Sequence, residues 1–340
     1  MAVADTHGVL ASVHAFRLGR IFPRTLLALI LGLALGGCTP APPEPLRIAA
    51  GQFAGYEPLY LARDLGLLDE DTVRLVEYAP GSQTLRAYRN GVVDGAALTL
   101  DEVLILAREG YNPRILATLS FSQGVDMVVA RPEVESLAGL RGRRIGVENT
   151  ALGAYFLSRV LFFAGIDRDE VTVVPMELAE HPQAFREGRA DALITYNLSP
   201  RQLDEMGAIK LFDSSSIPGE IVDVLIVRAR VLERAPEAVN ALVAGWTGAM
   251  NHIAEHPRDA AVRMAPRLRM SPDEFRENLT GLDLPEPARN LQLLSGDPPP
   301  LQTTMEDIKR FMISAGLLPG PVDLSGLIEP APLAAALESP

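Results

Sequence analysis

One sequence segment occurs twice in this chain, 97 positions apart. Residues 86–99, RAYRNGVVDGAALT, resemble residues 183–196, QAFREGRADALITY, and the Arg-Ile pair that begins at Arg47 has a counterpart at Arg144 with the same offset. Each copy has the pattern of a helix that ends at a glycine, an aspartate in the turn and then a buried strand. We interpret the repeat as two related α/β lobes. The alternative is a similar alternation of strands and helices without a common architecture.

Strand and helix patterns alternate along the first part of the chain, which predicts βαβ units and parallel sheets. We expect Ser82 to cap one of the helices and Gly91 to end it. The only tryptophan, Trp246, lies in an apolar helical pattern and is expected in the core. The predicted strands are 46–50, 72–78, 95–100 and 114–121, and the predicted helices are 57–68, 82–91 and 101–110.

The first 37 residues have the pattern of a targeting segment. Arginines precede an uncharged apolar run at 26–35, about the length of a signal-peptide h-region and shorter than the roughly 20 apolar residues that span a bilayer. The run leads to Leu35-Gly36-Gly37-Cys38, which resembles a bacterial lipobox, the motif whose cysteine is acylated and becomes the N-terminus. We therefore expect a signal peptide at 1–37 and an extended tether at 38–45. A plain secretory signal with an unrelated cysteine is the alternative.

Composition excludes several classes of partner and site. The formal net charge is −12, and Cys38 is the only cysteine. The acidic balance argues against nucleic acid as a partner. A single cysteine allows neither an internal disulfide nor a thiolate metal site.

No sequence motif indicates catalysis. A P-loop, a Gly-x-Ser-x-Gly motif and a His-Glu-x-x-His motif are all missing from the sequence. His252 and His256 have the i, i+4 spacing that can ligate zinc, but no further ligand is evident, so we interpret them as a solvent-facing helix end. We expect no catalytic residue, no metal and no cofactor.

Four segments together are similar to a known group of proteins. They are GYEPLYLARDLGLL, the repeated helix–Gly–Asp–strand unit, LAGLRGRRIGVENTALGAY and FDSSSIPGEIVDVLIV. They resemble the substrate-binding proteins of ABC importers, in the group that includes nitrate-, sulfonate-, taurine- and thiamine-precursor-binding proteins. The resemblance covers residues 45–260, and many relatives have a tryptophan where this chain has Phe53.

The resemblance implies a type II periplasmic-binding-protein fold with two lobes, two hinge crossovers and a ligand cleft. Lobe 1 would comprise 45–130 and 228–325, lobe 2 would comprise 131–227, and a tail would follow at 326–340. The protein would be a monomer that captures a small organic molecule and delivers it to permease and ATPase subunits. With the lipobox, the expected location is the periplasmic or cell-surface side of a membrane, anchored at Cys38. An enzyme on the same fold and a ligand-sensing lipoprotein are the alternatives.

Seven loops are expected to form the cleft, because ligands of open α/β sheets bind outside the carboxyl ends of the strands. The loops are residues 51–58, 80–84, 98–102, 120–126, 148–155, 195–200 and 213–223. Aromatic side chains in them can stack on a ligand, polar ones can hydrogen-bond to it, and the helix after Thr150 offers free N–H groups. Ordinary caps, turns and core packing are the alternatives for each residue. The predicted ligand-binding residues are Phe53, Tyr56, Glu57, Ser82, Thr99, Gln123, Glu148, Asn149, Thr150, Tyr196, Glu220 and Asp223.

The charges of these loops constrain the ligand. They contain no lysine or arginine and several acidic residues, whereas selectivity for an anion normally draws on a guanidinium fork or converging N–H donors. We therefore expect a neutral, zwitterionic or cationic ligand with an aromatic or apolar body, such as an amine or an aminopyrimidine-like compound. Glu148 and Asp223 are the leading candidates for a cation partner, followed by Glu57 and Glu220.

Replacing Cys38 with serine should prevent acylation and release the protein from the membrane, because the lipobox cysteine carries the anchor. Stable anchoring needs more than one acyl chain. Mass spectrometry of the processed protein checks this directly. An unmodified N-terminus at another residue would contradict the lipobox interpretation.

Overall fold

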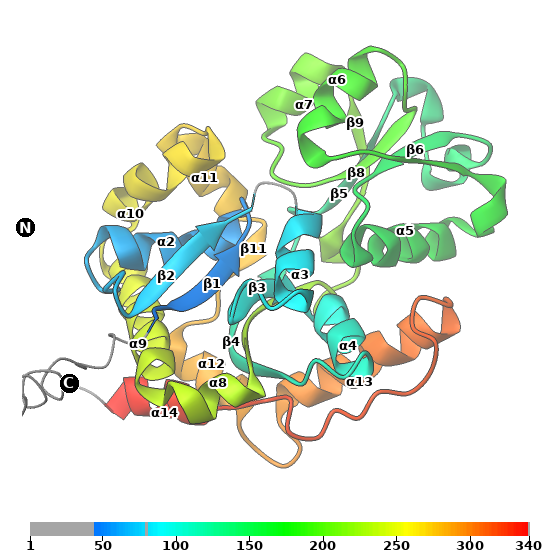
Figure 1. The fold of residues 1–340 in the computed structure, drawn as a ribbon. Helices are drawn as coiled ribbons and strands as arrows, with labels where there is room; N and C mark the ends of the chain where they lie inside the picture. The colour runs from blue at the N-terminus through cyan, green and yellow to red at the C-terminus, as the bar shows by residue number, and fades with distance from the viewer. Residues whose placement is uncertain (1–43, 79–80, 339–340) are drawn as a thin grey trace, which may run out of the picture. The chain divides into compact units, whose positions relative to one another are not determined.

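The computed structural model describes residues 44–78 and 81–338, so the predictions on the targeting segment and Cys38 lie outside the described residues. Its strands form two separate sheets with helices around each (Figure 1). The first lobe combines the blue-to-cyan and yellow-to-red parts of the chain, and the second lobe is the green middle part. The predicted α/β architecture of two lobes is therefore confirmed.

The first lobe contains a six-stranded sheet in the order β11-β4-β10-β3-β1-β2. Strands β1, β2 and β3 are parallel, and β10 is antiparallel to both β3 and β4. The strands are β1 (Leu46–Ala50), β2 (Val73–Glu77), β3 (Gly95–Thr99), β4 (Pro113–Ser122), β10 (Val222–Arg228) and β11 (Leu282–Asp283). The helices are α2 (Glu57–Asp64), α3 (Gly81–Arg89), α4 (Leu100–Arg108), α8 (Ala229–Arg234), α9 (Pro236–Glu255), α10 (Pro257–Met264), α11 (Pro272–Leu279), α12 (Pro287–Leu294), α13 (Pro300–Ser314) and α14 (Ala331–Glu338).

The second lobe contains a five-stranded sheet in the order β7-β6-β8-β5-β9. Here β6, β7 and β8 are parallel, and β5 is antiparallel to β8 and β9. The strands are β5 (Met127–Ala130), β6 (Arg144–Val147), β7 (Thr172–Pro175), β8 (Ala192–Thr195) and β9 (Ile209–Asp213). The helices are α5 (Ala151–Ala164), α6 (His181–Arg186) and α7 (Pro200–Met206).

The sequence repeat corresponds to a repeat of structure. In the first sheet Ile48 pairs with Gly95, and in the second Ile145 pairs with Ala192, so both pairs keep the offset of 97. The aspartate before the second strand has the same role in each lobe. The carboxylate of Asp94 accepts a hydrogen bond from the backbone N–H of Arg47 at 3.1 Å, and that of Asp191 accepts one from Arg144 at 2.9 Å. Each aspartate thus links the start of one strand, through a hydrogen bond, to the turn that precedes the neighbouring strand.

The expected strands and helices are present, with small differences at their ends. The helix expected at 57–68 ends at Asp64, and the one expected at 82–91 begins at Gly81. Ser82 therefore lies in the first turn of α3 and not before it, and its hydroxyl accepts a hydrogen bond from Arg86 at 3.2 Å. None of the helices in the described residues is long and apolar enough to cross a membrane.

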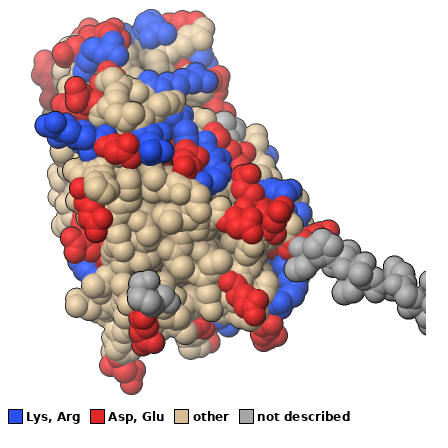
Figure 2. All heavy atoms as spheres, turned by 90° about the vertical axis from the view of Figure 1, so that its left-hand side faces the viewer, with Lys and Arg blue, Asp and Glu red and all other residues tan. Residues whose placement is uncertain are grey.

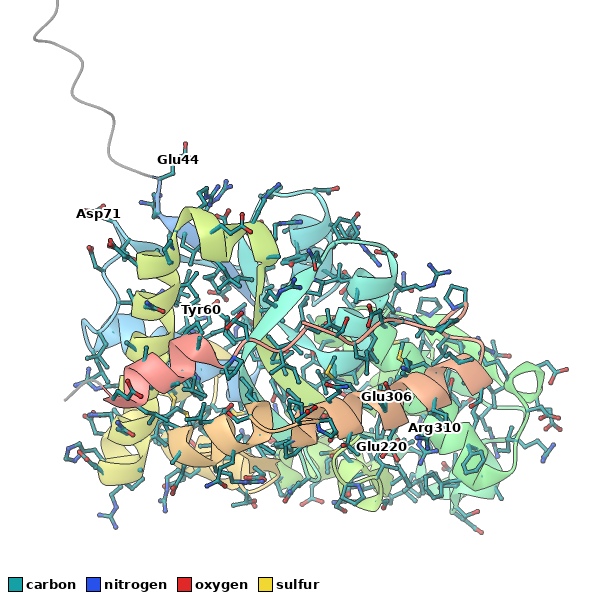
Figure 3. All side chains as sticks on the ribbon, turned by 90° about the horizontal axis from the view of Figure 1, so that it is seen from below. Glu44, Tyr60, Asp71, Glu220, Glu306 and Arg310 are labelled. Atoms are coloured by element: carbon teal, nitrogen blue, oxygen red, sulfur yellow. The ribbon has the colours of Figure 1, made fainter. Side chains whose placement is uncertain are left out.

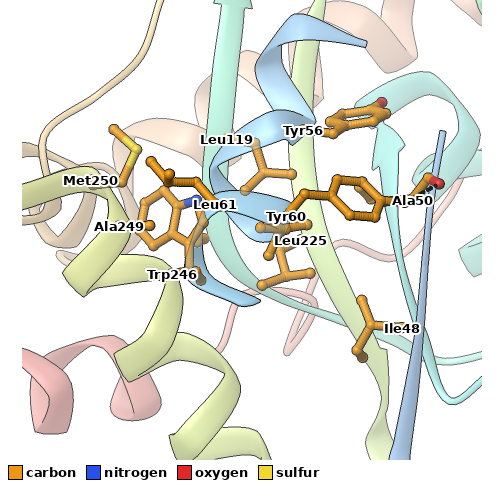
Figure 4. Packing of buried hydrophobic residues seen from close by; sticks show 14 of the residues in the cluster. Ile48, Ala50, Tyr56, Tyr60, Leu61, Leu119, Leu225, Trp246, Ala249 and Met250 are labelled. Carbon is orange, nitrogen blue, oxygen red and sulfur yellow. Dashed lines mark hydrogen bonds between the residues drawn. The ribbon is translucent and has the colours of Figure 1, made fainter. Parts of the chain in front are cut away.

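Alternate residues of the central strands pack on opposite faces of the first sheet, as the period of two requires. Leu225 and Val227 belong to the cluster on the α2 and α9 side, whereas Val224 and Ile226 belong to the cluster on the α4 and α13 side. Trp246 of α9 is fully buried in the first of these clusters, as predicted. Figure 4 shows its indole beside Leu61, with Tyr60 and Leu225 on the sheet side.

The chain passes between the two sheets twice, before β5 and before β10. The hydroxyls of Ser122 and Ser214 share a hydrogen bond of 2.6 Å, which joins the two crossing segments. The backbone N–H of Gly124 also donates to Ser214 Oγ at 2.7 Å. We propose that the lobes correspond to the two sheets with their helices, which moves the expected division from residues 130/131 to the segment before Met127.

One buried side chain completes the hydrogen bonding of β4. Strand β11 pairs with β4 only at its end, near Phe121 and Ser122. Farther along, the amide of Asn290 takes the place of a strand: Thr118 N–H donates to its Oδ1 at 3.0 Å, and its Nδ2 donates to the carbonyl of Thr118. Asn290 is completely buried, so both backbone groups of Thr118 depend on it.

Replacing Asn290 with alanine should lower the free energy of unfolding by about 2–4 kcal/mol, because two buried backbone groups lose their partner. Urea unfolding followed by circular dichroism measures the change. The matched control is Asn240→Ala on the exposed side of α9, which should stay within about 0.5 kcal/mol of the wild type. Equal stability of the two variants would contradict the assigned role of Asn290.

Candidate functional site

A pocket of about 70 Å³ lies where the carboxyl ends of the parallel strands of both sheets meet. All of its lining residues except Ala97 belong to the seven loops that the strand-end rule selects, and each of the seven contributes. They are Gly51, Gln52, Phe53, Tyr56, Gly81, Thr84, Ala97, Leu98, Thr99, Glu102, Asp126, Glu148, Thr150, Leu152, Tyr196, Ile221 and Asp223.

Three aromatic rings form one part of the pocket lining. The loop after β1 carries Phe53, and a short 3-10 helix then places Tyr56 directly before α2. The Phe53 ring makes edge-to-face contacts with Tyr56 at 5.2 Å and with Tyr196 at 5.7 Å between ring centroids. Tyr196 follows β8 of the second lobe, so these rings connect the lobes at the pocket.

Asp223 lies at the start of β10 and is almost completely buried. Its carboxylate accepts hydrogen bonds from Tyr56 Oη at 2.7 Å and from Ser120 Oγ at 2.6 Å. Burial raises the pKa of Asp223 to about 7, although both hydroxyl donors oppose the rise. Asp223 is thus held in place by neutral donors and has no cationic partner within the pocket lining.

Glu148 connects the two lobes across the pocket. It follows β6, and its carboxylate accepts hydrogen bonds from the backbone N–H of Gly81 at 3.3 Å and from Tyr196 Oη at 3.3 Å. Burial raises the pKa of Glu148, and the charge of Glu177 adds to the rise. On the same side, Asn197 Nδ2 donates to the carbonyl of Gln52 at 3.3 Å, which is a second contact between the lobes.

Two further carboxyl groups line the pocket. Glu102 lies in the first turn of α4, where it accepts a hydrogen bond from the backbone N–H of Thr99 at 3.2 Å. Burial, together with the charge of Asp101, raises the pKa of Glu102 to about 8. Burial also raises the pKa of Asp126 to about 6, although the nearby Ser122 hydroxyl opposes the rise, and Oδ2 of Asp126 has no hydrogen-bond partner among the described residues.

The pocket lining therefore carries four acidic side chains, and none of its residues is basic. Burial raises the pKa of all four carboxyl groups. Burying a carboxylate is unfavourable unless an opposite charge or a hydrogen-bond donor compensates. This environment favours ligands that supply positive charge or N–H donors and disfavours anions.

Seven of the predicted ligand-binding residues line this pocket, although the binding itself stays a prediction. They are Phe53, Tyr56, Thr99, Glu148, Thr150, Tyr196 and Asp223. Thr150 also caps α5, since its hydroxyl accepts from the backbone N–H of Gly153 at 3.0 Å.

The structure places the other five predicted residues outside the pocket lining. Glu57 is fully buried against Arg267, with 3.1 Å between their charged groups. Glu220 binds Tyr155 and Arg159, and Ser82 binds Arg86. The side chains of Gln123 and Asn149 are exposed. Each of these residues lies in the expected loop, but loop position alone does not give the direction of a side chain.

The prediction of single residues missed Gln52, Thr84, Glu102, Asp126 and Ile221, which also line the pocket. A signal was available for two of them. Asp126 ends the expected loop 120–126 and directly precedes the apolar run 127–130, and Glu102 stands three residues after Thr99, the spacing of a capping box.

A second hollow lies between α5 and α13, and residues 218–220 also line it. Glu220 and Arg310, both labelled in Figure 3, are among its lining residues. Its lining also includes Arg159, whose guanidinium pairs with Glu220 at 2.7 Å and lies 4.5 Å from the ring centroid of Phe311. The charge of Arg159 is therefore already paired within the protein.

The described residues show no metal site, and the face seen in Figure 2 shows no separate basic patch. Within residues 44–78 and 81–338, no group of three or more His, Cys, Asp or Glu side chains is arranged to hold a metal ion. On the face that Figure 2 shows, Lys and Arg side chains are mixed with Asp and Glu. His252 contacts His256 but hydrogen-bonds to Asp259 at 2.8 Å.

Comparisons with known proteins agree with this geometry. A sequence model of the family described as NMT1/THI5 like matches residues 54–260. The alkanesulfonate-binding protein SsuA from Xanthomonas axonopodis pv. citri, solved with bound MOPS, is 17% identical with a TM-score of 0.68, over 86% of this chain and 100% of that one. The periplasmic nitrate-binding protein NrtA from Synechocystis PCC 6803 is 12% identical with a TM-score of 0.69, over 87% and 89% of the two chains.

An enzyme has a similar structure. The desulfurization enzyme DszB is 18% identical with a TM-score of 0.64, over 87% of this chain and 99% of that one. No curated protein sequence matches the chain. At these identities the similarities show the fold, and they confirm the predicted type II periplasmic-binding-protein architecture.

The raised pKa of Asp223 should make the unliganded wild type gain stability as the pH falls from 8 to 5.5. The Asp223→Asn variant should gain less stability over the same range. The folded state binds a proton at Asp223 below about pH 7, whereas the unfolded chain does so only below about pH 4. The free energy of unfolding contributed by this group therefore rises as the pH falls from 8 towards 4. We expect the substitution to remove about 1–3 kcal/mol of this pH dependence, measured by urea unfolding.

The comparison with the variant is needed because another group acts in the opposite direction. Burial lowers the pKa of His181 to about 4, so this residue makes the protein less stable as the pH falls below about 6.5. His181 contributes equally to the wild type and to Asp223→Asn. Asp71→Asn on the exposed surface is the matched control and should keep the wild-type profile. Identical profiles for the wild type and Asp223→Asn would contradict a raised pKa at this site.

Proposed function

Because this chain belongs to the NMT1/THI5-like family, we propose that it is the extracytoplasmic solute-binding component of an ABC importer. The observation that carries the proposal is the pocket itself, whose lining comes from loops of both sheets. A solute in this position touches both lobes at once, so its binding energy favours the arrangement in which they are close. SsuA and NrtA, named as binding proteins, have the same fold.

In the proposed mechanism the lobes close on the solute by a hinge at the two crossing segments. Contacts between the lobes at the pocket rim, such as Phe53 with Tyr196 and Gly81 with Glu148, form on closure and break on opening. Each is a small contact, so closure and opening require only a few weak interactions to change. The tie between Ser122 and Ser214 is buried and holds the two crossings together as the lobes move.

Binding without chemistry fits the pocket better than catalysis does. DszB shows that enzymes occur on this fold, but the pocket lining contains no histidine, lysine or cysteine to act as a base or nucleophile. Its carboxyl groups with raised pKa values and the hydroxyls of Tyr56 and Tyr196 are the candidates for acid–base work. We therefore propose solute capture, with an enzyme on this fold and a ligand-sensing lipoprotein as alternatives. Lipid anchoring at Cys38 and delivery to a permease belong to the same proposal.

Two properties test the proposal: the lobes should close on the solute, and the solute should remain chemically unchanged. A thermal-shift screen identifies a solute, since a ligand that binds only the folded state raises the melting temperature. At saturating solute, small-angle scattering should show a smaller radius of gyration, and NMR should recover the solute unchanged. An unchanged radius of gyration would contradict capture by closure, and conversion of the solute into product would favour the enzyme alternative.

Replacing Phe53 with alanine should weaken solute binding about 10-fold, because the ring contacts Tyr56 and Tyr196 from both lobes and each aromatic contact is worth about 0.5–1.5 kcal/mol. Calorimetric titration with the solute from the screen measures the loss. Phe163→Ala on the exposed side of α5 is the matched control and should bind like the wild type. Full affinity in Phe53→Ala would remove the first loop from the proposed site.

A further inference from the structure

The pocket contains one carboxyl group whose hydrogen bonding is incomplete. Asp126 lies on the segment between β4 and β5, lines the pocket and is 4% exposed. Its Oδ2 is buried and has no hydrogen-bond partner among the described residues. A buried acceptor without a donor is costly, and such groups in native proteins mark a missing partner.

The other three carboxyl groups of the pocket already have donors from the protein. Asp223 accepts from Tyr56 and Ser120, and Glu148 accepts from Gly81 and Tyr196. Glu102 accepts from the backbone N–H of Thr99. These donors are all neutral, so they hold the carboxylates in place without neutralising their charge. The cluster is therefore short of both a hydrogen-bond donor and positive charge.

We propose that the pocket binds a small organic cation, a protonated amine or amidine, and that the carboxylate of Asp126 is its principal partner. The inference rests on the proposed solute-binding function and names the chemical class of the solute. An N–H donor of the cation would satisfy Oδ2 of Asp126, and its charge would offset the surrounding carboxylates. Hydrogen bonds between charged partners are about twice as strong as neutral ones.

The aromatic part of the lining suits the same class of ligand. Phe53, Tyr56 and Tyr196 lie close together at the pocket. Aromatic faces attract cations, and they also cover an apolar or flat body. An inorganic anion would gain neither contact and would meet repulsion from those of the four carboxyl groups that are ionised.

The position of Asp126 connects charge recognition to closure. Its backbone N–H donates to Ser122 Oγ at 3.3 Å, and its carbonyl accepts from the backbone N–H of Ser214 at 2.9 Å. Asp126 is therefore part of the hydrogen-bond cluster that joins the two crossing segments. A cation bound to its side chain lies at the hinge, where it can contact groups of both lobes.

Binding of a cation should release protons. A positive charge beside these carboxyl groups favours their ionised form, so groups that are partly protonated near pH 6–7 lose protons on binding. An anion would have the opposite effect and cause proton uptake. The ionisable groups on the elements around Asp126 are Tyr56, Asp101, Glu102, Glu148, Tyr196, Asp223 and the Lys210–Asp213 pair of β9.

Calorimetric titration of the full exported protein at pH 6.5 tests the inference. The probes are benzylamine and benzamidine as cations, benzyl alcohol as a neutral compound of similar size, and benzenesulfonate and nitrate as anions. We expect the cations to bind and the other three probes to bind at least 10-fold more weakly. Repeating the titration in phosphate and in maleate, which both buffer at this pH, contain no amine and differ in heat of ionisation, should show net proton release. Lowering the pH to 5 should weaken the binding of the cations.

Two variants assign the effect to Asp126. Asp126→Asn keeps the shape of the side chain and should weaken binding of the cations by about 10- to 100-fold, with an unchanged circular dichroism spectrum. Glu220→Gln is the matched control, because Glu220 is bonded to Tyr155 and Arg159 outside the pocket lining, and it should bind like the wild type. If Asp126→Asn does not fold, the sign of the proton change in the wild type still decides the matter.

The outcomes separate this inference from the proposed function. Binding of benzenesulfonate or nitrate with proton uptake, undiminished in Asp126→Asn, would overturn the cation proposal and leave solute capture standing. Chemical conversion of a bound cation would overturn solute capture and leave cation recognition standing. The inference is also wrong if neither cation binds more tightly than benzyl alcohol.

Discussion

A buried hydrogen bond between the hydroxyls of Ser122 and Ser214 joins the two segments by which the chain passes between its lobes. The backbone N–H groups of Gly124 and Asp126 donate to these same two hydroxyls. Because both crossings are fixed at one place, the strand ends of the two sheets meet at a common pocket. The position of every loop that lines the pocket depends on this arrangement.

The pocket is built at a cost in stability. Four carboxyl groups are buried in it without a basic residue in the lining, and their pKa values are raised. Away from the pocket, the buried acid Glu57 pairs with Arg267, whereas Asp101, beside Glu102 in α4, is buried without a basic partner. Carboxyl groups left uncompensated around one pocket reduce stability there, and such strain is typical of sites that bind a complementary ligand. This contrast within one chain supports recognition of a cation.

Two aspartates, one in each copy of the sequence repeat, explain why the two copies fold in the same way. Asp94 and Asp191 each accept a hydrogen bond from the first strand of their own lobe, so the same local interaction sets the same strand register twice. The next two strands also correspond: β10 lies antiparallel between β3 and β4, as β5 lies antiparallel between β8 and β9. The two sheets therefore share five strand positions, and the first sheet has β11 in addition.

The sequence by itself determined the alternation of strands and helices, the two lobes, the burial of Trp246 and the loops that line the pocket, because periodicity and strand direction are local properties. It did not determine which loop residues face the pocket. Glu57 and Glu148 both follow strand ends, yet Glu57 turns to Arg267 of a distant segment and Glu148 turns to the pocket. Nor did it identify Asp126 as the carboxylate with an unsatisfied oxygen. Side-chain direction and hydrogen-bond satisfaction depend on partners far away in the chain, and only the tertiary structure brings those partners together.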